Sequence, residues 1–303
     1  FDEWQDHPTF IEDVMRFLDN VLTDFINKAP DSMKRTKYAA MRERSVGLGV
    51  MGFHSFLQSK MIPMEGVMAK VWNRRIFLHI RRQADDASRL LAEERGACPD
   101  AEDYGVKERF SHKMAIAPTA SISIICGGSS PGIEPNAANA YTHKTLSGSF
   151  PVRNKFLAKL LEDKGRNDDE IWSSIITNEG SVQHLDFLTA DEKDVFKTAF
   201  EIDQRWLIEH AGDRTPYICQ AQSLNIFLPA NVHKADLHRI HWDAWKKGVK
   251  SLYYCRSKSI QRAESHASWQ RTKGAQPVTG DRNPELGDEE QQNGQYEECL
   301  ACQ

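Results

Sequence analysis

Apolar residues recur at helical spacing in two long stretches of the chain. Residues 11–26 carry apolar side chains three or four positions apart, which predicts an amphipathic helix. Residues 67–95 have the same period and are followed by Gly96 and Pro99, two residues that commonly end helices. The intervening stretch 27–35 is polar and contains a proline, so we expect a turn there.

The second half of the chain predicts shorter elements. Thr189 and Glu192 form a capping-box pattern, in which each side chain satisfies a backbone amide at the start of a helix. Further along, a strand, a helix and a strand in this order form a βαβ unit. The expected elements are a strand at 114–117, a helix at 153–164 closed by Gly165, a helix from 189 to about 210, a strand at 223–228, a helix at 233–247 and a strand at 249–254.

The last stretch of the chain has a different composition. After about residue 261 the apolar periodicity stops, and Gly, Pro, Gln, Asp and Glu dominate, which is typical of a flexible segment. Residues 281–303 contain seven acidic residues and one basic residue, a net charge of −6, which leaves about +2 for the rest of a chain whose total is −4. We therefore expect a folded part at 1–260 and a flexible acidic tail at 261–303.

Composition narrows the class of protein. A chain of 303 residues with 40% apolar and 27% charged residues is typical of a soluble globular protein with one large or two ordinary domains. No run of 18 apolar residues exists, and neither the body nor the tail resembles a nucleic-acid binder, so we expect no membrane and no direct nucleic-acid partner. The residues from Phe1 onward do not resemble a signal peptide, and the missing initial Met suggests that something upstream has been removed.

Cysteine usage favours a reducing compartment, the cytoplasm. Six cysteines occur, and a chain of this length needs no disulfide staples. Cys299 and Cys302 can close a small disulfide, and at the end of a mobile tail they can exchange it with distant partners. Half of a zinc site is a weaker interpretation because no second pair has ligand spacing, and an incidental pair stays open. The remaining cysteines stand singly at Cys98, Cys126, Cys219 and Cys255.

Two other stretches carry candidate chemistry. Tyr253 and Tyr254 are adjacent on an expected strand, so their side chains should point to opposite faces. Ordinary strand packing is the favoured interpretation, although neighbouring phenols can also pass a radical as one electron and one proton. Residues 117–123, Ala-Pro-Thr-Ala-Ser-Ile-Ser, have small hydroxyls and backbone amides that could cradle a phosphate if a helix begins there. Taken alone, this stretch is better interpreted as a strand-to-loop turn.

Glycines and histidines add little chemistry. Residues 45–53 contain three glycines, which permit close approach of another backbone. His238 and His241 stand three positions apart but have no third ligand nearby, so we favour a solvated or partly buried helix face over a metal site. His54, next to Phe53, is expected to be a packed histidine.

Several of these stretches together resemble the large, catalytic subunit of class I ribonucleotide reductases. The resemblance covers nearly all of the chain in the expected order, and the family also ends in a paired-cysteine tail. The matching segments are Arg-Ser-Val-Gly-Leu-Gly-Val-Met-Gly-Phe-His at 44–54, Met-Ala-Ile-Ala-Pro-Thr-Ala-Ser-Ile-Ser at 114–123, Ser-Pro-Gly-Ile-Glu-Pro at 130–135, Ser-Leu-Asn at 223–225 and Trp-Lys-Lys-Gly-Val-Lys-Ser-Leu-Tyr-Tyr at 245–254.

The resemblance implies a fold and a set of roles. The fold would be α/β, the C-terminal part of a ten-stranded α/β barrel with additional helices and the flexible tail. The reaction would be the radical reduction of a ribonucleoside diphosphate to its 2′-deoxy form. Tyr253 and Tyr254 would relay the radical, and Cys299 and Cys302 would re-reduce the active site and exchange with thioredoxin or glutaredoxin. The loop that holds the substrate diphosphate would be Pro118, Thr119, Ala120, Ser121 and Ile122, with Ala120 where many relatives carry a polar residue.

Part of the family's machinery is missing from these 303 residues. The family's thiyl-radical cysteine lies in an Asn-Leu-Cys segment near a glutamate, and no such segment occurs here; the N-terminal regulatory region is absent too. We therefore expect an N-terminal half of the large subunit as partner, either from a split gene or because the chain is a fragment. The small subunit would supply the radical from its own metal centre, so that no cofactor and no metal are expected on this chain.

Two rival functions stay open at this point. A cobalamin-dependent reductase of the same superfamily shares the glycine and phosphate-loop motifs, but it generates its radical in place and needs no tyrosine pair. A non-catalytic interaction protein, a degenerate remnant of a reductase, would have no reason to keep both the tyrosines and the tail cysteines. An upstream reading frame that encodes the missing half would identify the split-gene case.

Overall fold

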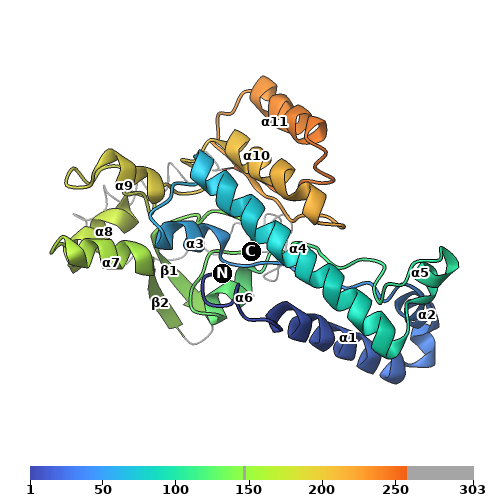
Figure 1. The fold of residues 1–303 in the computed structure, drawn as a ribbon. Helices are drawn as coiled ribbons and strands as arrows, with labels where there is room; N and C mark the ends of the chain where they lie inside the picture. Colours follow the sequence, from blue (N-terminus) through green and yellow to red (C-terminus); the bar gives the residue numbers. More distant parts are fainter. Residues whose placement is uncertain (146–147, 258–303) are drawn as a thin grey trace, which may run out of the picture.

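The computed structural model describes residues 1–145 and 148–257, so the expected tail at 261–303 lies outside the described residues. Helices dominate this part of the chain, and the long α4 runs through its middle (Figure 1). The helices are α1 (Phe10–Lys28), α2 (Lys34–Glu43), α3 (Phe53–Ser59), α4 (Val67–Arg95), α5 (Pro99–Asp103), α6 (Ala120–Ile125), α7 (Lys155–Asp163), α8 (Asp169–Thr177), α9 (Ala190–Val195), α10 (Gln204–Arg214) and α11 (Lys234–Lys246). The strands are β1 (Ala140–Thr145), β2 (Gly148–Arg153), β3 (Ile226–Leu228) and β4 (Cys255–Ser257).

Four extended segments lie side by side in parallel. Leu48 pairs with Met114, Ile116 pairs with Gln222, and β3 pairs with β4. Helices connect each segment to the next, as in an α/β barrel. Within the described residues these pairings do not close on themselves, which is the arrangement expected of part of a barrel, and the predicted α/β fold is confirmed.

Glycine brings the first two segments together. A Cβ atom added at Gly49 would lie 2.5 Å from the carbonyl oxygen of Ala115, closer than any side chain can approach. The N–H of Leu48 donates to the carbonyl of Lys113 at 2.8 Å, and the N–H of Ala115 donates back to Leu48 at 3.1 Å. The predicted close backbone approach at the glycine-rich stretch is confirmed.

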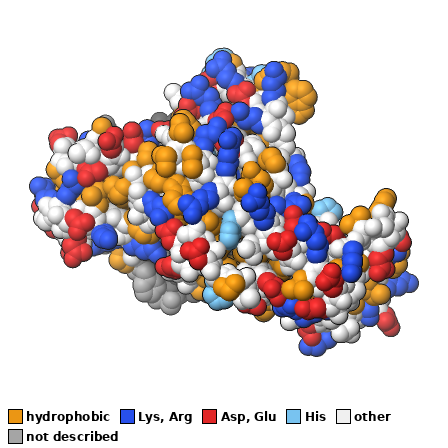
Figure 2. Space-filling view, viewed as in Figure 1, with side chains coloured by type: hydrophobic (Ala, Val, Ile, Leu, Met, Phe, Trp, Pro, Cys, Tyr) orange, Lys and Arg blue, Asp and Glu red, His pale blue; other side chains and the backbone are white. Residues whose placement is uncertain are grey.

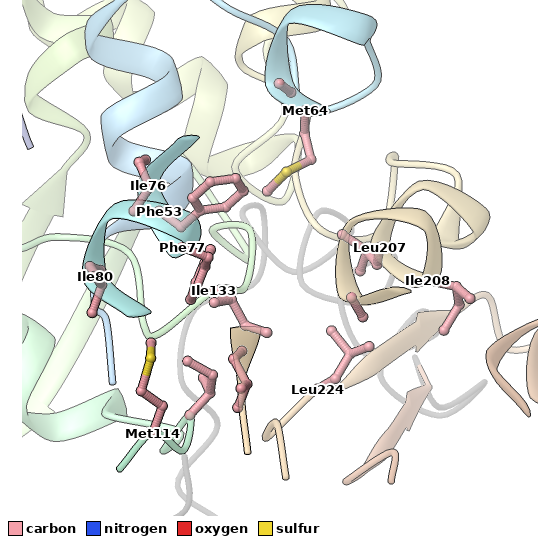
Figure 3. Packing of buried hydrophobic residues seen from close by; sticks show 14 of the residues in the cluster. Phe53, Met64, Ile76, Phe77, Ile80, Met114, Ile133, Leu207, Ile208 and Leu224 are labelled. Atoms are coloured by element: carbon pink, nitrogen blue, oxygen red, sulfur yellow. The ribbon is translucent and has the colours of Figure 1, made fainter. Parts of the chain in front are cut away.

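The main hydrophobic core lies between α4 and the extended segments. Phe53, Phe77 and Met114 meet there, and Ile133 points into the same cluster beside Phe77 (Figure 3). Leu224 enters it from the segment before β3 (Figure 3). The core therefore fixes the extended segments against α4 and holds the loops that follow them.

A buried arginine ties the third segment to α4. Arg214 on α10 donates to Asn73 Oδ1 at 3.0 Å and to Gln222 Oε1 at 2.7 Å. Its guanidinium also lies 5.6 Å from the ring centroid of Phe53 and 5.5 Å from that of Phe77. Burial lowers the pKa of Arg214 to about 9, so it still carries its charge at neutral pH.

A second, smaller core packs α7, α8 and α9 on the β1–β2 hairpin. Its fully buried members include Leu157, Leu161, Trp172 and Phe196. In Figure 1 these helices gather at one end of the molecule, apart from α10 and α11.

Charges of both signs are mixed on the surface. Lys and Arg alternate with Asp and Glu over the face seen in Figure 2, instead of gathering into one basic stripe.

The sequence predicted α1, α4, α7 and α11 closely, but it indicated no helix at α3, α5 or α8 and misjudged three further stretches. The single helix expected from 189 to 210 is two, because buried side chains bind the backbone between them: Asn139 donates to the carbonyl of Phe196, and Gln204 to that of Ala199. The polar stretch 27–35 ends in a short 3₁₀ turn, and α2, which was not predicted, begins at Lys34. The last strand is β4, which begins only after the tyrosine pair.

The capping box and the βαβ unit are confirmed. Thr189 Oγ1 accepts the N–H of Glu192, and Glu192 accepts the N–H of Thr189 in return. The strands β3 and β4 are parallel and joined by α11. Among the described helices, none combines the length and the apolar character that crossing a bilayer requires.

One carboxylate holds α1 to three other parts of the chain. Asp19 is fully buried and accepts hydrogen bonds from Arg44, Arg95 and Arg109 at 2.5–3.2 Å. Because Arg44 and Arg109 are buried as well, Asp19→Ala would leave two buried charges without their partner. We expect this variant to lose about 3–5 kcal/mol of unfolding free energy, measured by urea denaturation. Asp24→Ala, an exposed carboxylate on the same helix, is the control and should change it by less than about 0.5 kcal/mol.

The same carboxylate sets a pH dependence. Burial raises the pKa of Asp19, but the hydrogen bonds from Arg109, Arg44 and Arg95 outweigh burial and hold the pKa below its ordinary value of 3.8. A lowered pKa means that the stabilisation is complete above the ordinary value and is lost as the pH falls through the lower, folded-state pKa. The difference between the wild type and Asp19→Ala should therefore stay constant from about pH 5 to pH 8. A difference that grows as the pH falls would contradict it.

Candidate functional site

The loop 118–122 turns from an extended segment into α6. Ile116 takes part in the parallel pairing just before the loop, and α6 begins at Ala120. Thr119 at the turn has a left-handed φ of 54°, and its Oγ1 accepts the N–H of Gly132 at 2.7 Å. A helix therefore begins at the point where the phosphate interpretation requires one, and the first amides of a helix have no partner inside it.

The loop exposes its second half. Pro118, Thr119 and Ala120 are half-buried, whereas Ser121 and Ile122 are exposed. Ser121 and Ile122 are therefore the part of the loop that a ligand from solvent could reach.

A cavity of about 370 Å³ lies beside α6, between this helix and the β1–β2 hairpin. Ser123, Asn139, Tyr141 and Lys155 contribute to its lining. Of the five predicted loop residues, Ala120 alone lines this cavity. The exposed side of the loop, not the cavity, is thus where Ser121 can meet a ligand.

The two tyrosines contact each other. The ring centroids of Tyr253 and Tyr254 lie 4.2 Å apart with a 53° angle between the rings, and both side chains are more than 40% exposed. The prediction that they point to opposite faces is wrong, because the pair lies just before β4 and does not adopt the alternation of a regular strand. The two phenol rings therefore meet at the surface of the described part of the chain.

Backbone hydrogen bonds hold the pair in place. The N–H of Tyr253 donates to the carbonyl of Leu224, and the carbonyl of Tyr254 accepts the N–H of Ile226, both at 2.9 Å. The guanidinium of Arg256 lies 5.9 Å from the ring centroid of Tyr254. The tyrosine pair is therefore fixed to the segment that leads into β3.

Glu134 and Asn225, for which the sequence predicted no role, meet beside the tyrosines. Glu134 is buried, and both of its carboxylate oxygens accept hydrogen bonds from Asn225, which is buried too. Burial raises the pKa of Glu134, while these hydrogen bonds act in the opposite direction. The sequence signal that could have identified this pair is Glu134 itself. It is a charged residue between Ile133 and Pro135, in a stretch that the structure buries.

The cysteines separate into two groups. Cys299 and Cys302, the predicted redox pair, lie outside the described residues. Cys98 is buried, Cys126 and Cys255 are exposed, and Cys219 accepts the N–H groups of two neighbouring residues through its sulfur. No two of these four form a disulfide.

The histidines lie where the sequence suggested. His54 is fully buried; burial lowers its pKa to about 3, and its Nδ1 accepts the N–H of Asn136. His238 stacks on Trp242 along an exposed face of α11, and His241 contacts the carbonyl of Leu237. Within residues 1–145 and 148–257, no group of three or more His, Cys, Asp or Glu side chains could hold a metal ion.

One protein family matches nearly the whole described part of the chain. The family described as "Ribonucleotide reductase, barrel domain" matches residues 2–108 and 100–255. This match covers the glycine-rich stretch, the loop 118–122 and the tyrosine pair.

Individual proteins agree with the family match. The chain is 49% identical over 272 residues to the ribonucleoside-diphosphate reductase large subunit of Invertebrate iridescent virus 6, and 45% identical over 263 residues to that of Invertebrate iridescent virus 3. These alignments cover 88% and 86% of the chain but 28% and 41% of the relatives. Among solved structures, the class Id ribonucleotide reductase alpha subunit of Actinobacillus ureae aligns with a TM-score of 0.79 and 40% identity, over 86% of the chain and 48% of that subunit. The chain thus spans half or less of the length of these proteins.

Proposed function

Since the chain belongs to the ribonucleotide reductase family through its barrel domain, we propose that it forms the C-terminal part of the catalytic subunit of a class I ribonucleoside-diphosphate reductase. The observation that carries this proposal is the contact between the exposed rings of Tyr253 and Tyr254. A reductase that receives its radical from another subunit needs such a pair at its surface, whereas one that makes its radical in place does not.

The reaction balances with a dithiol as reductant. A ribonucleoside diphosphate and two thiols give a 2′-deoxyribonucleoside diphosphate, a disulfide and water, so that two electrons and two protons are consumed in each turnover. The radical starts this reaction and is returned at its end. As the radical moves inward, the tyrosines therefore pass one electron and one proton outward toward the small subunit. They pass the same back inward when the radical is returned, and they supply no net reducing power.

Each part of the chain has a task in this proposal. Residues 118–122 hold the substrate diphosphate with backbone amides and the hydroxyl of Ser121, Tyr253 and Tyr254 relay the radical, and Cys299 and Cys302 renew the reducing thiols. Thioredoxin or glutaredoxin would reduce the tail in turn. The thiyl-radical cysteine would come from the N-terminal half of the large subunit, and the radical from the metal centre of the small subunit.

A charge placed in the loop tests the phosphate assignment. In the assembled reductase, Ser121→Asp is expected to raise the KM for a ribonucleoside diphosphate at least about tenfold, which corresponds to ~1.4 kcal/mol, because the new carboxylate repels the diphosphate. Ser121→Asn keeps similar size without the charge and should change KM far less. Steady-state kinetics with both variants make the comparison. Equal KM values for the two variants would place the diphosphate somewhere else.

A further inference from the structure

The segment 130–135 connects the proposed phosphate loop with the proposed relay. At one end, the N–H of Gly132 donates to Thr119 Oγ1, and a Cβ atom added at Gly132 would lie 3.0 Å from the carbonyl oxygen of Ala117. In the middle, Ile133 is buried in the main core. At the other end, Glu134 binds Asn225. The position of Glu134 is therefore set by the core and by the loop as well as by its own hydrogen bonds.

The hydrogen bonds are all donated in one direction, from Tyr254 to Asn225 and from Asn225 to Glu134. The backbone N–H of Asn225 donates to Glu134 Oε1 at 2.9 Å, and Asn225 Nδ2 donates to Glu134 Oε2 at 3.0 Å. With its amide nitrogen turned toward Glu134, Asn225 presents Oδ1 to the N–H of Tyr254, which donates to it at 3.0 Å. A carboxylate accepts at both oxygens and donates at neither, so it permits only this orientation of the Asn225 amide.

We propose that Glu134 is a positioning residue for the radical relay: through Asn225 it fixes the backbone of Tyr254 and with it the contact between the two phenol rings. This inference rests on the proposed function of the tyrosine pair. Electron and proton transfer between two side chains depends steeply on their separation and orientation, so a small displacement of the Tyr254 backbone would slow the relay. Substrate binding at the exposed side of the loop 118–122 would change little.

Glu134→Gln creates a specific conflict. The introduced amide oxygen must face the N–H of Asn225, because that donor is fixed, and the introduced amide nitrogen then faces Asn225 Nδ2. If the Asn225 amide rotates to relieve this, its nitrogen turns toward the N–H of Tyr254, and two donors oppose each other there. The conflict is thus transmitted to Tyr254 in either case.

A second substitution should remove the conflict. Asn225→Asp supplies two acceptor oxygens, of which one can accept from the introduced glutamine and the other from the N–H of Tyr254. The double variant Glu134→Gln/Asn225→Asp also keeps one buried negative charge, which moves from position 134 to its hydrogen-bonded partner at position 225. Asn225→Asp alone should fail, because two carboxylates would then face each other. The two single variants and the double variant form a double-mutant cycle.

The experiment measures single-turnover product and the KM for a ribonucleoside diphosphate in the assembled reductase. We expect Glu134→Gln to lower the single-turnover rate at least about tenfold, with KM changed by less than about threefold, and the double variant to recover most of the rate. Glu162→Gln, on an exposed position of α7, is the control and should behave as the wild type. The same two quantities are measured for Tyr254→Phe, which tests the relay itself.

The outcomes separate the inference from the proposed function. If Tyr254→Phe is inactive while Glu134→Gln keeps the wild-type rate, the relay stands and the positioning role is wrong. If the double variant fails to recover the rate, whether or not the single variant is stable, the hydrogen-bond chain does not act as described. If Tyr254→Phe is fully active, the relay itself is wrong, and any effect at Glu134 has another origin.

Discussion

Replacing Tyr254 by Phe is expected to reduce single-turnover deoxynucleotide formation by the assembled reductase at least about 1,000-fold, which corresponds to ~4 kcal/mol. Phe retains the ring and most of its contact with Tyr253, whose centroid lies 4.2 Å away. It lacks the O–H group, however, and cannot lose an electron and a proton together. Tyr253→Phe should have the same effect, because a relay fails when either member is missing.

A surface tyrosine elsewhere on the chain provides the control for this experiment. Tyr104 is 88% exposed at the end of α5, and Tyr104→Phe should keep the wild-type single-turnover yield. Thermal unfolding of all three variants should be close to that of the wild type, since Phe keeps the aromatic ring at each position. Full single-turnover yield from Tyr253→Phe or Tyr254→Phe would make the pair a packing feature and would remove the main support for a class I reductase.

Changing both tail cysteines to serine should leave the first turnover intact and stop the following ones. Each turnover consumes two electrons, and in this account Cys299 and Cys302 deliver them from thioredoxin to the active site. We expect the double variant to make about one round of product and then to stall, so that its steady-state rate with thioredoxin falls at least about 100-fold. A small dithiol that enters the active site directly should restore part of the rate.

The exposed Cys126 offers a matched control for the tail. Cys126→Ser removes a surface thiol that the account does not use, and it should keep the wild-type steady-state rate with thioredoxin. Single-turnover yield and steady-state rate are compared for both proteins. A tail variant that turns over normally with thioredoxin would show that the electrons reach the active site by another route.

Local patterns in the sequence were sufficient for the elements whose start and end are encoded locally. The long helix α4 agrees with its predicted bounds, 67–95, because its apolar period is uninterrupted and Gly96 follows it. The capping box at Thr189 was also visible, since both partners lie within one turn. The break between α9 and α10 was not, because side chains distant in sequence, such as Asn139, bind the backbone there.

The candidate site likewise has a part that local sequence patterns could predict and a part that they could not. The loop 118–122 and the tyrosine pair were recognisable because each is a short contiguous motif. The link from Glu134 to Asn225 joins residues 91 positions apart, and no local pattern reports such a contact. The orientation of the tyrosines depended on where the β3–β4 pairing begins, and this pairing is set by the fold and not by the residues of the strand.

Product formation in a single turnover is the measurement that tests the central claim most directly. The assembled enzyme containing this chain, mixed with a small subunit and a ribonucleoside diphosphate but no external reductant, should form the corresponding 2′-deoxyribonucleoside diphosphate. We expect about one molecule of product for each assembled active site, and none when the small subunit is left out. Absence of deoxynucleotide from the complete mixture, or an equal amount without the small subunit, would contradict it.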